Sequence, residues 1–89
     1  MFSIKKFNVR LLNTNENYGI AGGFTADKPM VEFYDSRYDF TPYGQFINRY
    51  YLDTVLDHDT GLVLHGGVSE WTLSSNDMIL VREYLKSVA

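Results

Sequence analysis

The residue types best suited to chemistry gather in one short segment past the middle of the chain. Asp57, His58 and Asp59 are consecutive, and His65 follows a few residues later. Imidazole and carboxylate groups are ligands that zinc and manganese accept, so these four side chains suggest a small metal-dependent or hydrolytic enzyme. Their spacing matches no defined metal motif, and a calcium loop starting at Asp57 would place Val68 where a bidentate glutamate is required. We therefore expect a charged turn without metal or cofactor, and we keep the enzyme as an alternative.

The same segment contains Asp59-Thr60-Gly61, the triplet that aspartic proteases use. An enzyme of this size would have to dimerise so that two carboxylates share a proton. Here the triplet follows two polar residues where those proteases have apolar strand residues, and it precedes Leu62 where they have a small residue. A turn that ends on glycine after a helix explains it better. No phosphate-binding loop, dinucleotide fingerprint or nucleophile elbow occurs elsewhere, so we expect no catalytic residue and no enzyme.

A second unusual segment is the aromatic window YDSRYDFTPYGQFINRYY, residues 34–51, which holds five of the seven tyrosines. Tyrosine and arginine are over-represented in the hot spots of protein interfaces. We therefore predict a partner-binding surface centred on Arg37, Tyr38, Tyr43, Arg49 and Tyr50. The structural alternative is that these aromatic rings close a small core beneath the connecting loop. The full predicted surface comprises Asp35, Arg37, Tyr38, Asp39, Tyr43, Phe46, Arg49, Tyr50, Asp53 and Asp57.

Strands must position these side chains, and the first strand signal lies near the start of the chain. Phe7, Val9 and Leu11 alternate with polar residues, which predicts a strand near residues 4–13. Asparagine and glycine then favour a turn, and the segment IAGGFTA resumes the alternation. We expect these two strands to form a hairpin, with a bulge or kink at Gly22-Gly23.

Two more strand regions are indicated farther along the chain. MVEFYD, residues 30–35, predicts a third strand with Val31 and Phe33 on one face. LVLH, residues 62–65, predicts a short strand, and Gly66-Gly67 suits the tight loop of a hairpin that joins it to VSEWTL. A single strand followed by a loop is the other interpretation of this segment.

Two helices complete the prediction. A Thr-Pro pair at residues 41–42 is a helix start signal, and a helix from there to residue 57 places Ile47, Tyr51 and Val55 on one side. Ser74 is suited to cap the last helix. The apolar stripe of that helix comprises Met78, Val81, Tyr84, Leu85 and Val88. We predict one α+β domain over residues 1–89, in the order β-β-β-α-β-α, with two amphipathic helices on one face of an antiparallel sheet of about four strands.

Length and charge restrict the function classes. Eighty-nine residues allow a single domain. A net charge of −3 argues against direct nucleic-acid binding, which needs a basic surface to displace counterions from phosphates. The absence of cysteine excludes disulfides and zinc–thiolate sites. No apolar run has the length of a membrane span and the N-terminal residues lack the apolar region of a signal peptide, so we expect a cytoplasmic monomer or homodimer that does not bind membranes.

The succession YDSRYDFTPYGQFINRYYLDTVL, then GLVLHGGVSEWTL and an amphipathic last helix, resembles short proteins encoded by bacteriophages and prophages, which include small anti-CRISPR inhibitors of type I systems. The resemblance covers residues 31–88. It implies a stoichiometric inhibitor that binds a bacterial Cas subunit or surveillance complex and blocks target-DNA binding or nuclease recruitment, and it carries no catalytic residue. Acidic side chains at Asp53, Asp57 and Asp59 would suit competition with nucleic acid for a basic groove of the partner.

A third hypothesis is a homo-oligomeric structural module. In that arrangement, Phe46 and Tyr50 would be buried at a symmetric interface between copies.

Overall fold

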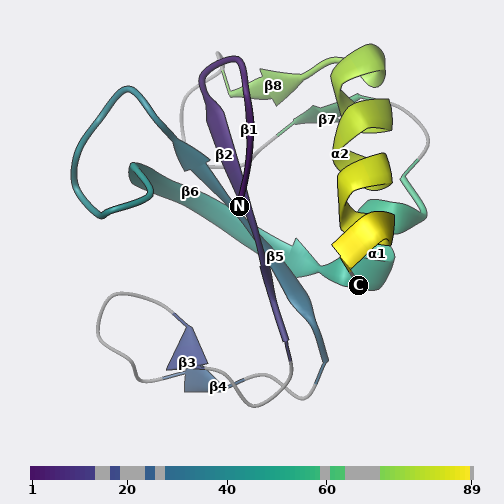
Figure 1. The fold of residues 1–89 in the computed structure, drawn as a ribbon, viewed down its shortest axis with the longest axis horizontal. Helices are drawn as coiled ribbons and strands as arrows, with labels where there is room; N and C mark the ends of the chain where they lie inside the picture. Colours follow the sequence, from purple (N-terminus) through teal and green to yellow (C-terminus); the bar gives the residue numbers. More distant parts are fainter. Residues whose placement is uncertain (14–16, 19–23, 26–27, 59–60, 64–70, 89) are drawn as a thin grey trace.

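The computed structural model describes residues 1–13, 17–18, 24–25, 28–58, 61–63 and 71–88, and these ranges form an α+β domain (Figure 1). Its centre is a four-stranded antiparallel sheet in the order β1-β2-β5-β6, formed by β1 (Phe2–Ile4), β2 (Phe7–Leu12), β5 (Met30–Asp35) and β6 (Gln45–Tyr51). The short strands β3 (Asn17–Tyr18) and β4 (Phe24–Thr25) pair with each other, as do β7 (Leu62–Val63) and β8 (Thr72–Leu73). The helices are α1 (Leu52–Leu56) and α2 (Ser75–Val88). No helix within these ranges is both long and apolar enough to cross a membrane.

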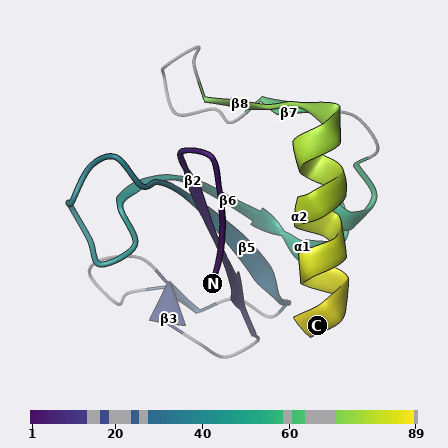
Figure 2. The same cartoon turned by 45° about the horizontal axis from the view of Figure 1, so that its top comes forward.

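The two faces of the central sheet differ in composition because successive strand residues point to opposite sides. We call the face that packs against α1, α2 and the β7–β8 pair the inner face, and the opposite one the outer face. Both helices lie on the same side of the sheet in Figures 1 and 2. The main core lies between them and the inner face, and its buried members are Phe7, Val9, Val31, Phe33, Ile47, Leu52, Val55, Trp71, Leu73, Met78, Val81 and Leu85.

The predicted strand over residues 30–35 is confirmed, and it lies at the centre of the sheet between β2 and β6. The predicted first strand is divided in two, because Lys5 has a positive φ of 51° and turns β1 back onto β2. The expected hairpin with IAGGFTA is wrong, because β2 pairs with β1 and β5, and the described end of that segment, β4, pairs with β3. Gly22-Gly23 lies outside the described residues.

The helix predicted from Thr41 to Asp57 is wrong over most of its length. Residues 45–51 form strand β6, and only the short helix α1 follows. Thr41 does not cap a helix, because its Oγ1 donates to the carbonyl oxygen of Gly44 at 2.7 Å and closes a tight turn. The strand β6 contains a β-bulge opposite Phe33, where Ile47 is the additional residue. This bulge reproduces part of a helical spacing, since it shifts the alternation of faces along the strand by one residue.

The C-terminal part of the chain agrees with the sequence more closely. Ser74 caps α2, because its Oγ accepts a hydrogen bond from the backbone N–H of Asp77 at 3.2 Å. Met78, Val81 and Leu85 are buried, whereas Val88 is exposed. Strands β7 and β8 pair as expected, but Leu62 lies opposite Leu73, and a two-residue loop at Gly66-Gly67 would place Trp71 there. Residues 64–70 lie outside the described ranges.

Candidate partner-binding surface

The connection between β5 and β6, residues 36–44, is the centre of the predicted surface, and we call it the aromatic loop. Its first anchor is Asp35, the last residue of β5, which is fully buried. Both carboxylate oxygens of Asp35 accept hydrogen bonds from the Arg37 side chain, Oδ1 from Nε at 3.0 Å and Oδ2 from Nη2 at 2.7 Å. The Oδ1 atom also accepts from the Arg37 backbone N–H at 3.0 Å, and Oδ2 accepts from Trp71 Nε1 at 2.9 Å. Asp35 therefore joins the start of the loop to the residue that precedes β8.

This contact network sets the charge state of Asp35. The Arg37 guanidinium holds the pKa of Asp35 well below its usual range, the Trp71 indole and the Arg37 backbone N–H act in the same direction, and burial acts against them. Asp35 is consequently a carboxylate at neutral pH, and the charge of Arg37 is largely balanced inside the loop. Asp35 was predicted as a surface residue, but it is buried and stabilises the loop through its hydrogen bonds to Arg37 and Trp71.

Two further contacts hold the aromatic loop. At its start, the backbone N–H of Ser36 donates to the carbonyl oxygen of Lys6 at 2.8 Å. At its end, Gly44 has a φ of 119°, and a Cβ at this position would lie 2.3 Å from the carbonyl oxygen of Asp35. Only glycine satisfies both requirements, because other residues rarely adopt this φ and their Cβ would collide with the backbone. The loop therefore closes tightly against the end of β5.

The aromatic loop presents two exposed aromatic side chains, beside the exposed Ser36, Arg37, Asp39 and Pro42. Phe40 is 75% exposed and Tyr38 is 44% exposed. The two rings lie 6.5 Å apart between centroids, and the Arg37 guanidinium lies 5.4 Å from the centroid of Tyr38. In Figures 1 and 2 the loop projects from the sheet on the side away from α2. The loop is thus an exposed aromatic projection whose base is buried and hydrogen-bonded.

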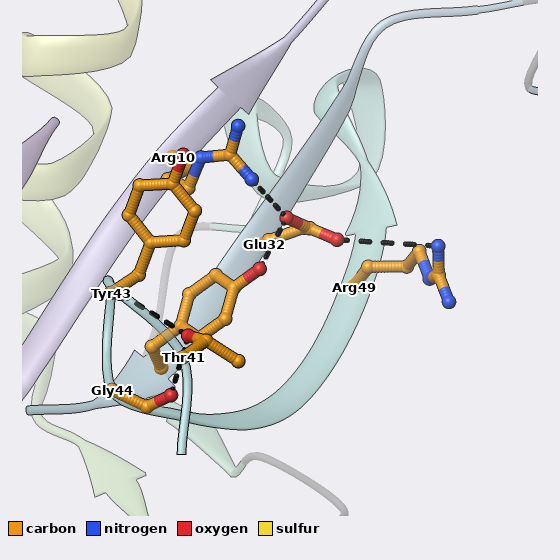
Figure 3. Close-up of polar contacts among 7 residues, drawn as sticks. Arg10, Glu32, Thr41, Tyr43, Gly44 and Arg49 are labelled. Atoms are coloured by element: carbon orange, nitrogen blue, oxygen red, sulfur yellow. Dashed lines mark hydrogen bonds and ion pairs between the residues drawn. The ribbon is translucent and has the colours of Figure 1, made fainter. Parts of the chain in front are cut away.

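A second cluster lies beside the loop on the outer face, around the fully buried Glu32 (Figure 3). The Oε1 atom of Glu32 accepts hydrogen bonds from Arg10 Nη1 at 2.9 Å and from the Tyr34 hydroxyl at 2.7 Å. The Oε2 atom of Glu32 lies 4.0 Å from Arg49 Nη1, so the two groups form an ion pair that is too long for a hydrogen bond. Glu32 Oε2 has no hydrogen-bond partner. Glu32 therefore holds an arginine from each neighbouring strand, β2 and β6.

Aromatic rings surround this ion-pair cluster. The Arg10 guanidinium lies 4.0 Å from the centroid of Tyr43, and the Arg49 guanidinium lies 5.3 Å from that of Phe46. Tyr34 packs between them, with its centroid 5.4 Å from Tyr43 and 5.6 Å from Phe46. Burial, and then its hydrogen bond to the Glu32 carboxylate, raises the pKa of Tyr34 to about 12. Cations and aromatic rings thus alternate across the part of the outer face nearest the loop.

The structure divides the ten predicted surface residues into separate groups. Phe46 and Arg49 of β6 lie on the outer face with Tyr43 from the end of the aromatic loop, and Arg37, Tyr38 and Asp39 lie earlier in that loop. Tyr50 lies on the inner face, where its ring packs edge-on against Phe33 at 5.9 Å between centroids. Asp53 and Asp57 are exposed in and just after α1, which follows the far end of β6. The predicted grouping of Arg49 with Tyr50 assumed a helix, and in a strand these neighbours point to opposite faces.

Four residues of this surface, Tyr34, Phe40, Arg10 and Glu32, were absent from the predicted set. Phe40 is the most exposed aromatic residue of the described loop, and its alternation with Tyr38 was a signal within the aromatic window. Arg10 and Glu32 are opposite each other in the β2–β5 register, so the contact follows from strand pairing that the sequence did not reveal. Neither residue lies within a motif.

The alternative metal site is only partly described. Asp59 and His65 fall outside the described residues. Within the described part of the chain, no group of three or more histidine, cysteine, aspartate or glutamate side chains is placed to hold a metal ion. His58 Nε2 is hydrogen-bonded to the carbonyl oxygen of Gly61 at 2.9 Å, and the His58 carbonyl oxygen accepts from Arg82 of α2. These contacts give His58 a role in joining the α1 end to α2.

Comparison with known proteins adds no assignment. No protein-family model, curated protein or solved structure matches the chain significantly.

Proposed function

We propose that this protein is a non-enzymatic, phage-type inhibitor that binds a bacterial defence protein through the aromatic loop. The observation that carries the proposal is the exposure of Tyr38 and Phe40 on a loop whose base is fixed by the buried Asp35. Large exposed aromatic side chains are costly to solvate, and they provide much of the binding energy in protein interfaces. A fixed loop also loses little conformational freedom when it binds, so more of that energy appears as affinity.

The proposed partner is a Cas subunit or surveillance complex of a type I CRISPR system in the bacterial cytoplasm. Its support is the resemblance of residues 31–88 to small phage-encoded anti-CRISPR proteins, a segment that includes the entire aromatic loop. Because Asp35 balances the charge of Arg37, the exposed Asp39 carboxylate is the remaining charge of the loop tip, between Tyr38 and Phe40. An aromatic tip with one acidic group suits an apolar pocket bordered by a basic side chain, so we propose that inhibition occurs by covering a protein-docking site, where a nuclease or another subunit would bind.

The test uses the purified chain, a purified type I surveillance complex and two matched variants. Phe40→Ala removes the most exposed ring of the loop, and Leu80→Ala removes a 48% exposed apolar side chain from the solvent-exposed side of α2. We expect Phe40→Ala to weaken binding about 30-fold or more, as expected for a hot spot of about 2 kcal/mol, and Leu80→Ala to leave it unchanged. Both variants should keep the urea midpoint of the parent, since neither side chain is buried.

Two outcomes would contradict different parts of the proposal. If the parent neither binds the complex nor reduces CRISPR interference in cells, the partner assignment is wrong. If the parent binds and Phe40→Ala binds equally well, the partner stands and the role of the aromatic loop is wrong.

A further inference from the structure

Three cations at the outer face each lie over an aromatic ring. The pairs are Arg10 with Tyr43 at 4.0 Å, Arg49 with Phe46 at 5.3 Å and Lys28 with Tyr51 at 5.7 Å, measured from the cation to the ring centroid. Arg10 lies in β2 and Arg49 in β6, whereas Lys28 precedes β5. Tyr51 is 43% exposed, and the side chains of Arg10 and Arg49 are about a quarter exposed. The outer face therefore presents partly exposed cation–aromatic pairs, whereas Leu12 and Met30 of the same face are buried beside Tyr51.

The charge of this face differs from that of the whole chain. The three cations are accompanied there by one described carboxylate, that of Glu32, which is buried beneath them. The chain as a whole has a net charge of −3, and the described carboxylates that are exposed include Asp39 in the aromatic loop and Asp53 and Asp57 in and just after α1. The net charge of the chain argues against nucleic-acid binding, but it is a sum over all surfaces and does not describe the charge of one face. The outer face has the local positive charge that phosphates require.

The geometry of the face suits a single strand. With roughly 3.3 Å per strand residue, Phe46 and Tyr51 lie about 13–16 Å apart along the bulged strand β6. This distance is enough for the two or three bases that a four-stranded sheet stacks on its aromatic residues in known RNA-binding domains. The aromatic loop and the β3–β4 pair both lie on the side of the sheet away from α2 in Figures 1 and 2, which favours a thin strand over a wide duplex.

We propose that the outer face binds single-stranded nucleic acid. Tyr51 and the stacked Arg10–Tyr43 pair provide platforms for bases, and Lys28 and Arg49 contact phosphates. Base stacking on aromatic rings combined with cationic contacts to the backbone is the mode by which proteins bind single strands without sequence preference. The buried Glu32 carboxylate fixes Arg10 on the sheet through a hydrogen bond, and it attracts Arg49 across 4.0 Å. An acidic protein segment would satisfy the charges but would make no use of paired stacking platforms.

The experiment measures fluorescence anisotropy of a labelled oligothymidine of about 12 nucleotides, a length within the range that single-strand sites cover. The double variant Lys28→Ala/Tyr51→Ala removes an exposed cation and its ring, and Leu80→Ala/Lys86→Ala removes an exposed apolar residue and a cation from α2. We expect binding of the parent to weaken with salt at a slope of about −1.4 to −2.1 in log–log form, for two or three phosphate contacts. The first variant should bind at least about tenfold more weakly, and the second should bind as the parent does.

Several results would overturn this inference. They are the absence of binding by the parent at about 0.1 mM, the upper limit of ordinary non-specific affinity; equal binding by the parent and Lys28→Ala/Tyr51→Ala; and tighter binding of a duplex of the same length. Displacement of the oligonucleotide by an equal concentration of oligoglutamate would assign the face to an acidic protein segment. Phe40→Ala separates the two proposals, because it should lose the Cas partner and keep the oligonucleotide.

Discussion

Replacing Asp35 by asparagine tests whether the aromatic loop is fixed by its buried carboxylate. The change keeps the size of the side chain and one acceptor oxygen, but it removes the charge and turns an amide toward the donors of Arg37. The carboxylate accepts two hydrogen bonds from the Arg37 side chain, one from its backbone and one from Trp71 Nε1. Hydrogen bonds to a charged group contribute about 1.5–3 kcal/mol each and are not additive.

The expected loss is smaller than the sum of these bonds. The Arg37 side chain is 44% exposed, so water replaces part of what it loses. The Trp71 indole is buried and keeps the remaining oxygen as its acceptor. We therefore expect Asp35→Asn to lower the free energy of unfolding at neutral pH by about 2–4 kcal/mol, out of roughly 4–13 kcal/mol for a chain of this length.

Urea unfolding followed by tryptophan fluorescence measures this loss directly, because Trp71 is the sole tryptophan and contacts the mutated group. With a slope of about 1 kcal/mol per molar urea, the midpoint should fall by about 2–4 M. The matched control is Asp39→Asn, an exposed carboxylate of the same loop, which should stay within about 0.5 kcal/mol of the parent.

The pH dependence provides a second measurement on the same variant. The folded pKa of Asp35 is depressed, so its contribution is fully present above the unfolded value of about 3.9 and is lost as pH falls toward the folded value. The difference in stability between parent and Asp35→Asn should therefore be constant near neutral pH and decrease below about pH 4. A difference under about 0.5 kcal/mol at neutral pH, or one that does not narrow in acid, would refute the reasoning.

Three more predictions concern residues around the same surface. Gly44→Ala should destabilise the protein by about 2–4 kcal/mol in urea unfolding, since it combines a positive φ with a Cβ that meets backbone; a loss under about 0.5 kcal/mol would contradict the close contact. Tyr34→Phe should lower the free energy of unfolding at neutral pH by about 1–3 kcal/mol, because it removes a hydrogen-bond donor to the buried Glu32. The pKa of Tyr34 in the folded protein is raised to about 12, so the stability advantage of the parent over this variant should disappear as pH rises from about 10 to 12. Spectroscopic titration of the tyrosines checks the pKa shift. Ser74→Ala should cost about 1 kcal/mol through the lost helix cap, seen as a lower thermal midpoint, whereas an unchanged midpoint would show that the cap is dispensable.

The sequence predicts well those elements in which local pattern and tertiary position agree. Strand β5 is rich in aromatic and β-branched residues, and the last helix has both a capping serine and apolar residues at helical spacing. The segment around Ile47 was misassigned because two signals competed. The Thr-Pro pair and the four-residue spacing of Ile47 and Tyr51 favoured a helix, whereas the aromatic and β-branched composition of QFINRYY favoured a strand. Pairing with β5 decides for the strand, and such long-range pairing is not visible in a local window.

The candidate surface was predicted in part for the same reason. The aromatic window correctly directed attention to the exposed Tyr38 and its loop. The cluster around Glu32 needed the β2–β5–β6 registers, because Arg10 and Arg49 come from segments that are far apart in sequence. A buried glutamate in an alternating strand looks like an ordinary exposed residue until its partners are known.

Because of the bulge, the effect of deleting one residue from β6 depends on the position of the deletion. Phe46 and Arg49 share the outer face although they are three residues apart, because Ile47 and Asn48 both oppose Phe33. Deletion of Asn48 would restore regular alternation and leave every other side chain of β6 on its present face. Deletion of one residue elsewhere in the strand would instead exchange the outward and inward sets beyond that point. The bulge is therefore the position at which β6 can lose a residue while its cation–aromatic pairs, its core contacts and its junction with the end of the aromatic loop stay on their present faces.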